Sequence, residues 1–158
     1  MTGKEGIIMI PTEHALENYN LTITQEIHVN ASLEITFEAL LEELQDAQSP
    51  SGPIPMKLEA WPGGRWYRDL GNNNGHFWAV VQAIKRPTLL EFHGPLMMSY
   101  PVVSNVQYRL SEAKGGTLIT FHHLAFGHVP DDFRQGATAG WGGIHERLVK
   151  RAEAKSKR

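Results

Sequence analysis

The feature that most constrains the fold is an unbroken series of strand-like segments between Met56 and Phe126. Apolar residues recur at every second position in these segments, and turns rich in glycine, asparagine or proline separate most of them. Strands joined by short turns pair antiparallel, because a parallel pair needs a long crossover. The series therefore predicts an antiparallel sheet of six consecutive strands, at residues 56–60, 65–70, 76–85, 88–92, 102–110 and 117–126.

The alternation predicts which residues of two strands face inward, but it does not decide the inward face of a third strand. The residues predicted to face the core are Val106, Tyr108 and Leu110 on one strand and Ile119, Phe121, His123 and Ala125 on the next. In residues 76–84 both parities are apolar. That strand is either buried on both faces or presents one face to a partner, such as a second copy of the chain.

A strand and a helix precede this series. Residues 21–29 alternate like a half-buried strand, and Ser32 belongs to a short group of residues that favour helix caps. The helix that follows carries four apolar residues on one face, namely Phe37, Leu40, Leu41 and Leu44. It should end near Gln48, because the prolines and glycine that come next cannot continue it.

A second helix, Asp131–Ala152, follows the series, with Asp131 or Asp132 as its expected cap. Its apolar stripe consists of Phe133, Ala137, Trp141, Ile144, Leu148 and Ala152. Four glycines interrupt it, at 136, 140, 142 and 143, and each costs about 1 kcal/mol relative to alanine. Either this is an ordinary helix docked on a sheet, or its glycines leave room for a ligand. We expect the basic residues at its end to be solvated, namely Arg147, Lys150, Arg151, Lys155, Lys157 and Arg158.

The order of elements predicts an α+β fold in one domain. The chain has 158 residues, a single-domain length, and no repeat or linker divides it. Two helices at the ends of the series must cover one face of the sheet. We expect an N-terminal arm at 1–20, the domain at 21–152 and a basic tail at 153–158.

Composition excludes several classes of protein. The net charge is −2, so no global field recruits nucleic acid, and the arginines form no basic stripe with aromatics. The chain has no cysteine, which excludes disulfides and thiol catalysis. No apolar run approaches the ~20 residues of a membrane span. We expect a cytoplasmic protein with no membrane insertion.

No motif predicts a cofactor, a metal or a catalytic residue. His122 and His123 are adjacent but point to opposite faces of a strand, and no carboxylate is spaced to join them. The serines lack the nucleophile elbow G-x-S-x-G. The glycine pairs fit neither a Walker loop nor G-x-G-x-x-G.

Three pieces of the sequence resemble one family. Residues 58–65 (LEAWPGGR) resemble its LE…PGGR signature, residues 116–127 resemble its GT…H…G strand, and Gly140-Trp141 with Leu148 resembles the GW…L of its last helix. The chain is thus similar, from about Leu21 to Arg151, to the activator of Hsp90 ATPase homologue 1-like family, in the START/Bet v 1-like (SRPBCC) superfamily. The resemblance implies a helix-grip fold, in which a curved antiparallel sheet of six to seven strands wraps a long C-terminal helix over a cavity.

The residues expected to line such a cavity are mostly aromatic or histidine. The candidates are Trp66, Trp78, His93, Met97, Tyr108, Phe121, His123, Trp141, Ile144 and His145. His145 lies at the edge of the helix stripe, one turn after Trp141. Met97 lies in an apolar loop with adaptable side chains that could gate the cavity. For each residue alone, a place in the core is the competing interpretation.

Three functions remain open at this point. The first is a binding module for a small apolar or aromatic molecule or a lipid. The second is a cyclase, dehydratase or hydrolase that uses the same cavity through His123, His145 or Tyr108. The third is a protein-interaction role, as a co-chaperone or stress factor, with a chaperone or a second copy of the chain (a homodimer) as the partner. We expect a single domain without the extra N-terminal domain of the eukaryotic co-chaperone, which counts against direct activation of Hsp90.

Overall fold

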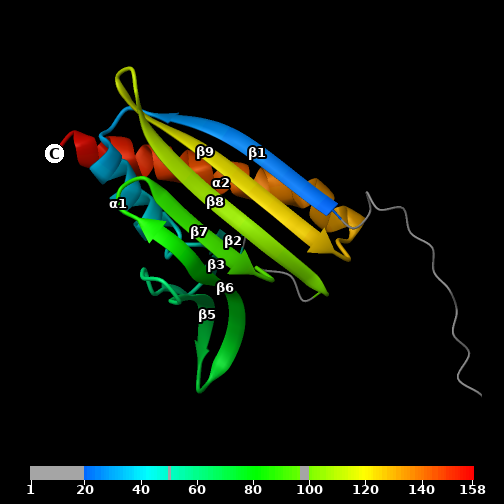
Figure 1. The fold of residues 1–158 in the computed structure, drawn as a ribbon. Coiled ribbons are helices and arrows are strands. Elements are labelled where there is room, and N and C mark those ends of the chain that lie inside the picture. The colour runs from blue at the N-terminus through cyan, green and yellow to red at the C-terminus, as the bar shows by residue number, and fades with distance from the viewer. Residues whose placement is uncertain (1–19, 50, 97–99) are drawn as a thin grey trace, which may run out of the picture.

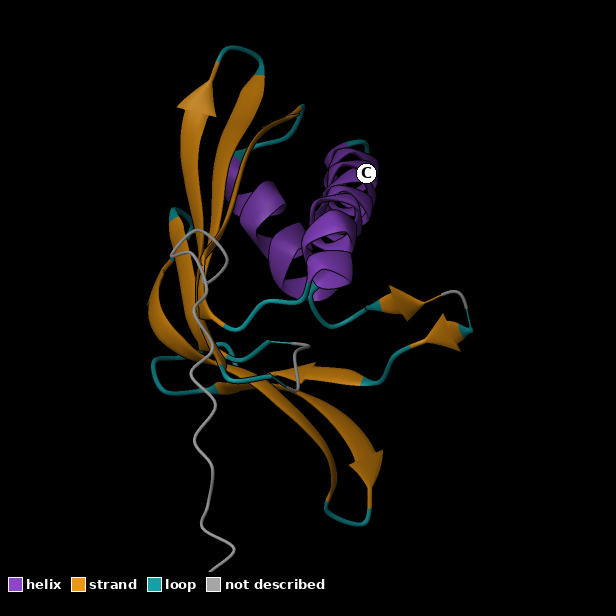
Figure 2. Ribbon diagram, turned by 90° about the vertical axis from the view of Figure 1, so that its right-hand side faces the viewer, coloured by secondary structure: helices purple, strands orange, loops and turns teal. Residues whose placement is uncertain are grey.

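The structure, a computed structural model, describes residues 20–49, 51–96 and 100–158. Its main sheet is curved and carries two helices on its concave face (Figures 1 and 2), and a second sheet has only two strands. The strands are β1 (Asn20–Val29), β2 (Gln48–Ser49), β3 (Gly52–Pro53), β4 (Met56–Leu58), β5 (Arg65–Gly71), β6 (Asn74–Lys85), β7 (Leu89–Gly94), β8 (Val102–Ala113) and β9 (Gly116–Gly127). The helices are α1 (Leu33–Glu43) and α2 (Asp131–Ser156).

The predicted antiparallel sheet is confirmed. Its seven strands run in the order β1-β9-β8-β7-β6-β5-β4, so the six consecutive strands are neighbours and β1 adds to the end of the series. β1 pairs antiparallel with β9 along its whole length, from Asn20 opposite Phe126 to Val29 opposite Thr117. α2 runs diagonally across the concave face (Figure 1), which gives the helix-grip arrangement.

The turn chemistry is as the sequence predicted. Asn72 and Asn73 have φ of 53° and 60°, and they join β5 to β6 where Gly71 pairs with Asn74. Two positive φ values in a two-residue loop define a type I′ hairpin, which matches the right-handed twist of the strands. Gly63, in the turn before β5, has φ of 82°, a value that suits glycine.

Two β-bulges explain why the alternation failed in β6. Trp66 pairs with Ala79 but Tyr67 pairs with Phe77, so Trp78 is an extra residue in the ladder. In the same way, Val81 pairs with Phe92 and Ala83 pairs with Glu91, so Gln82 is an extra residue with no partner in the ladder between β6 and β7. Each bulge shifts the parity of the strand and increases its bend. Consequently the adjacent residues Trp78 and Ala79 are both buried, while Phe77 is half exposed.

α1 begins as predicted and ends sooner. The hydroxyl of Ser32 caps it by accepting from the Ile35 N–H at 3.3 Å. The helix ends at Glu43, not near Gln48, because the N–H groups of Gln45 and Asp46 bond to carbonyls three residues back. The prolines and glycine that follow form the short hairpin β2–β3, which the sequence did not predict.

α2 differs from the prediction at both ends. Its N-cap is Pro130, which has no side chain able to cap, so neither Asp131 nor Asp132 caps the helix. Both acidic residues lie in the first turn, where they stabilise the positive end of the helix dipole. The helix continues to Ser156, through most of the predicted basic tail.

Some predictions lie outside the described residues. These are the N-terminal arm up to residue 19 and the loop residue Met97. Among the residues that are described, no helix is long and apolar enough to cross a membrane.

A substitution at Gly94 can test how closely β7 packs against the bulged strand β6. A Cβ at this position would lie 2.7 Å from the Ala79 Cα and would overlap the Trp78 carbonyl oxygen, which accepts the Leu96 N–H. Gly94→Ala should therefore lower the free energy of unfolding, measured in urea, by roughly 2–3 kcal/mol. Gly136→Ala is the matched control: it meets open space in an exposed part of α2 and should raise stability by up to about 1 kcal/mol. A Gly94→Ala variant whose free energy of unfolding equals that of the unmodified protein would contradict this packing.

Candidate functional site

The buried face of α2 is centred differently from the predicted stripe. Its buried residues are Ala137, Trp141, His145, Leu148 and Ala152. His145, predicted at the edge, is only 3% exposed, whereas Phe133 and Ile144 are half-buried. The face that meets the sheet therefore contains a polar residue at its middle, and that residue needs a hydrogen-bond partner.

The predicted inward faces of β8 and β9 are confirmed, since all seven residues named for them are buried. Phe121 lies at the centre of the contact with α2. Its ring centroid is 4.7 Å from that of Trp141, 4.6 Å from that of His145 and 4.9 Å from that of Tyr108. This layer fills the space between the middle of the helix and the sheet.

The first polar link across this layer joins Trp141, His123 and Ser104. The Trp141 indole N–H donates to His123 Nδ1 at 3.0 Å, and His123 Nε2 lies 3.0 Å from the Ser104 hydroxyl. Because Nδ1 accepts, the proton of a neutral imidazole is on Nε2 and is donated to Ser104. All three side chains are buried, so the link is closed off from solvent.

The second link joins Gln25, His145 and Tyr108. His145 Nδ1 lies 2.5 Å from the Gln25 side-chain oxygen, and Nε2 lies 3.1 Å from the Tyr108 hydroxyl. The amide oxygen only accepts, so Nδ1 carries the proton and the tyrosine O–H donates to Nε2. The helix is thus hydrogen-bonded to both β1 and β8.

Burial holds these groups uncharged. Desolvation lowers the pKa of His123 and of His145 to about 4 and raises the pKa of Tyr108 well above its usual value. Near pH 7 both histidines are neutral and both ring nitrogens of each are engaged. These residues connect helix and sheet and are not in contact with a solvent-accessible space.

A cavity of about 300 Å³ opens beside this layer. It lies between α2, the end of α1 with the β2–β3 segment, and the bulged part of β5 and β6. Its aromatic wall is Trp66, Trp78 and Trp141, with Ile144 beside them. The Trp66 ring is fixed, because its N–H donates to the Leu44 carbonyl at 2.8 Å and the ring stacks on Phe92.

Two of the helix glycines line this cavity. Gly140 and Gly143 belong to its wall, together with Ala139. A Cβ at Gly140 would meet nothing within 4 Å, so the absence of a side chain there contributes free space. The other two helix glycines, Gly136 and Gly142, are not part of the wall.

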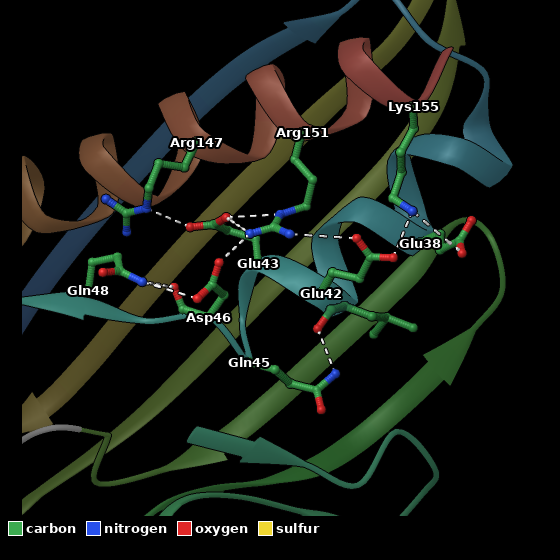
Figure 3. Close-up of polar contacts among 10 residues, drawn as sticks. Glu38, Glu42, Glu43, Gln45, Asp46, Gln48, Arg147, Arg151 and Lys155 are labelled. Atoms are coloured by element: carbon green, nitrogen blue, oxygen red, sulfur yellow. Dashed lines mark hydrogen bonds and ion pairs between the residues drawn. The ribbon is translucent and has the colours of Figure 1, made fainter. Parts of the chain in front are cut away.

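The cavity has a charged rim that the sequence analysis missed. Glu43 lines the cavity, is buried, and accepts from Arg147 Nε at 2.7 Å and from Arg151 Nη2 at 3.1 Å (Figure 3). Arg151 also binds Asp46 at 2.7 Å, and Lys155 binds Glu42 at 2.7 Å. The prediction that these basic residues form a solvated face was therefore wrong for Arg151 and Lys155, which are largely covered, whereas Arg147 is ion-paired on one side and partly exposed on the other.

A cross-helix pairing of this kind has only a weak signal in the sequence. Arg147, Arg151 and Lys155 are spaced four apart, which places them on one side of α2. The acidic residues of α1 are similarly placed on one side of that helix. Nothing in the two patterns said that the helices lie side by side.

The structure divides the ten predicted site residues into groups. Trp66, Trp78, Trp141 and Ile144 line the cavity together. Tyr108, Phe121, His123 and His145 form the packed layer behind it. His93 is exposed on the opposite face of the sheet, because it alternates with the buried Phe92. Met97 lies outside the described residues.

Other concave regions lie on the surface of the described residues, including two that differ from the cavity in their lining. An open groove of about 750 Å³ on the convex face includes His93, Val103, Leu124 and Phe126. A polar one of about 490 Å³ lies at the β5–β6 hairpin. Both are more open to solvent than the inner cavity, and neither contains the tryptophan cluster. Within the described residues, no three histidine or acidic side chains gather as metal ligands.

The comparisons with known proteins agree with this geometry. The family model for activator of Hsp90 ATPase homolog 1-like protein matches residues 30–153, most of the chain. The chain belongs to this family. No curated protein matches the sequence.

Solved structures support the fold. Protein MLL2253 from Mesorhizobium loti has a TM-score of 0.64 and 19% identity, covering 84% of this chain and 97% of that one. Ara h 8.0201 has a TM-score of 0.62 and 14% identity, covering 85% and 99%. The di-domain ARO/CYC StfQ from the steffimycin biosynthetic pathway has a TM-score of 0.61 and 9% identity, covering 90% and 52%. At these identities the likeness establishes the fold alone.

The buried histidines predict a loss of stability in mild acid. Both have pKa values near 4 when folded and near 6.5 when unfolded, so the unfolded chain binds more protons between these values. The free energy of unfolding should fall as pH drops through this window, by up to about 3 kcal/mol for each histidine. Glu59, whose pKa Arg65 lowers to about 2, titrates below it.

The measurement is urea unfolding at several pH values between about 7 and 4.5. The His145→Gln variant should lose about half as much stability over this range as the unmodified protein, because one of the two titrating groups is gone. His76→Gln, at an exposed histidine, should lose as much as the unmodified protein. An equal loss in the His145 variant would show that this imidazole is not held neutral.

Proposed function

We propose that this protein binds a small apolar or aromatic molecule in the cavity between α2 and the sheet. The observation that carries the proposal is the joint placement of Trp66, Trp78 and Trp141 around about 300 Å³ of free space. Ligand sites are concave, mostly apolar and often of this size or larger. The glycines on the helix wall support it further, because they lower the intrinsic stability of α2 without improving its packing.

Binding is favoured over catalysis by the position of the titratable groups. The residues suggested for acid–base chemistry, His123, His145 and Tyr108, do not line the cavity and are bonded to one another or to neighbours. A general base must reach the proton that it removes, directly or through one water. StfQ carries ARO/CYC in its name, and an enzyme of that kind is the alternative in this fold.

The outer face favours a second role, contact with another copy of this chain. Val103, Leu124 and Phe126 are 64%, 51% and 64% exposed, and they line one apolar groove on β8 and β9. Exposed apolar patches of this kind are typical of protein interfaces. A homodimer formed here would leave the inner cavity unaffected, because the two lie on opposite faces of the sheet.

The experiment is native mass spectrometry of freshly purified protein, which reports subunit number and any retained small molecule together. We expect the dominant species to carry an added mass that organic solvent removes. In Gly140→Leu the leucine side chain should fill the cavity, so the added mass should disappear while the circular dichroism spectrum is unchanged.

Gly136→Leu is the matched control, because position 136 lies on the same helix, meets open space and does not line the cavity. It should keep the added mass. Retention of the molecule in Gly140→Leu would contradict the assignment of the site.

A further inference from the structure

We propose that the ligand of this cavity is an aromatic or alicyclic carboxylic acid, whose carboxylate binds the guanidinium of Arg147 at the rim. This inference rests on the proposed function, since it names the chemical class that the same cavity takes. Arg147 is part of the cavity wall, which otherwise consists mainly of apolar side chains.

Two of the three guanidinium nitrogens of Arg147 are available to donate hydrogen bonds to a ligand. Its Nε donates to Glu43 Oε1 at 2.7 Å, and the side chain is 38% exposed. Within the described residues its two terminal nitrogens make no hydrogen bond, and Figure 3 shows them directed away from Glu43. A guanidinium binds a carboxylate through two parallel N–H···O bonds, and the terminal pair of nitrogens is one of the edges that can do so.

The ion pair with Glu43 fixes the position of the Arg147 guanidinium. Glu43 is buried and accepts from Arg147 with one oxygen and from Arg151 with the other. This arrangement orients Arg147 and pairs each oxygen of Glu43 with a guanidinium, so the negative charge of Glu43 is offset by the positive charges of Arg147 and Arg151. A pre-oriented donor loses less conformational entropy on binding than a mobile one.

The guanidinium of Arg147 lies close to Gly143, a residue of the cavity wall. An ideal Cβ at Gly143 would lie 3.6 Å from the Arg147 Nη1 atom, and Gly143 is itself part of the wall. A Cβ at position 143 would thus be in ordinary van der Waals contact with this nitrogen, so the guanidinium lies directly beside the cavity wall. Gly140 differs, because a Cβ there would meet no atom within 4 Å.

Size and polarity select the ligand class. A volume of about 300 Å³ is at the lower end for ligand sites, which favours a compact one- or two-ring molecule over a long lipid. The tryptophan wall suits a flat apolar body. A charge-assisted bond at the edge of such a site is stronger than one in water, because the surroundings are less polarisable. The best fit is therefore a ring system with one acidic substituent.

The test uses two probes of the same shape, 2-naphthylacetate and the neutral 2-(2-naphthyl)ethanol, in isothermal titration calorimetry at pH 7. We expect the unmodified protein to bind the acid at least about tenfold more tightly than the alcohol, because two charge-assisted hydrogen bonds replace the one neutral-acceptor bond that the alcohol can make. In Arg147→Gln the acid should fall to the affinity of the alcohol, while the alcohol binds as before. Lys150→Gln removes the same charge from an exposed position of the same helix and should keep the preference.

Arg147→Lys covers the case in which the glutamine variant does not fold. Its single ammonium should be engaged by Glu43, so the preference should again be reduced. Equal binding of the two probes by the unmodified protein, or a preference that survives in both Arg147 variants, would overturn the carboxylate inference and leave the proposed function standing. Failure of both probes to bind the unmodified protein would overturn the proposed function itself.

Discussion

The hydrogen bond from the Trp141 indole to His123 is the contact on which the rest of the site depends. It crosses from the middle of α2 to the middle of β9, inside a layer of rings packed on Phe121. Loss of either partner would leave a buried polar group unsatisfied, at a cost of about 1–3 kcal/mol. This contact therefore fixes both the height of the helix above the sheet and its rotation. Held in this way, Trp141 is almost wholly buried, and the small part of its surface that remains uncovered lines the cavity.

Space remains beside this layer because the sheet is bent away from the helices by its bulges, while the two helices are held to each other by ion pairs. The bulges of β6 bend the sheet and place Trp78 inward next to Trp66, whose ring is held by the Leu44 carbonyl. On the other side, Glu43 ties α1 to α2 through two arginines. A buried carboxylate is stable only when paired and fully hydrogen-bonded, which here requires both helices in one relative position. The walls are thus rigid while the space between them is not filled.

Much of the architecture could be predicted from the sequence, because the physical signals for it are local. Alternation along β8 and β9 identified the inward faces, and the GNNNG turn identified the β5–β6 hairpin. The parts that could not be predicted depend on contacts between distant segments. A bulge at Trp78 is invisible in an alternating pattern, since both parities are apolar there. The pairing of Glu43 with Arg147 needs the relative placement of two helices that are far apart in the chain.

The same distinction applies to the candidate site. The glycines of α2 left a cavity as one of two interpretations, and the family resemblance made it the expected one; aromatic content then selected Trp66, Trp78 and Trp141, and the helix stripe selected Ile144. His123 was placed inward by alternation along its strand and His145 near the cavity by its position on the helix, and both proved to be buried and hydrogen-bonded at both ring nitrogens. Periodicity placed His145 at the edge of the helix stripe because it is polar. Its bonds to Gln25 and Tyr108, which lie more than thirty residues away, are what allow it to occupy the centre.

The central claim is that the inner cavity, and not the larger outer groove, binds an apolar molecule. Heteronuclear NMR of ¹⁵N-labelled protein titrated with 2-(2-naphthyl)ethanol tests it directly. The account predicts saturable shifts at the indole N–H groups of Trp66, Trp78 and Trp141 and at the amides of Gly140 and Gly143, with Val103, Leu124 and Phe126 unchanged. Shifts confined to those last three residues, or no saturable shift at any tryptophan, would contradict it.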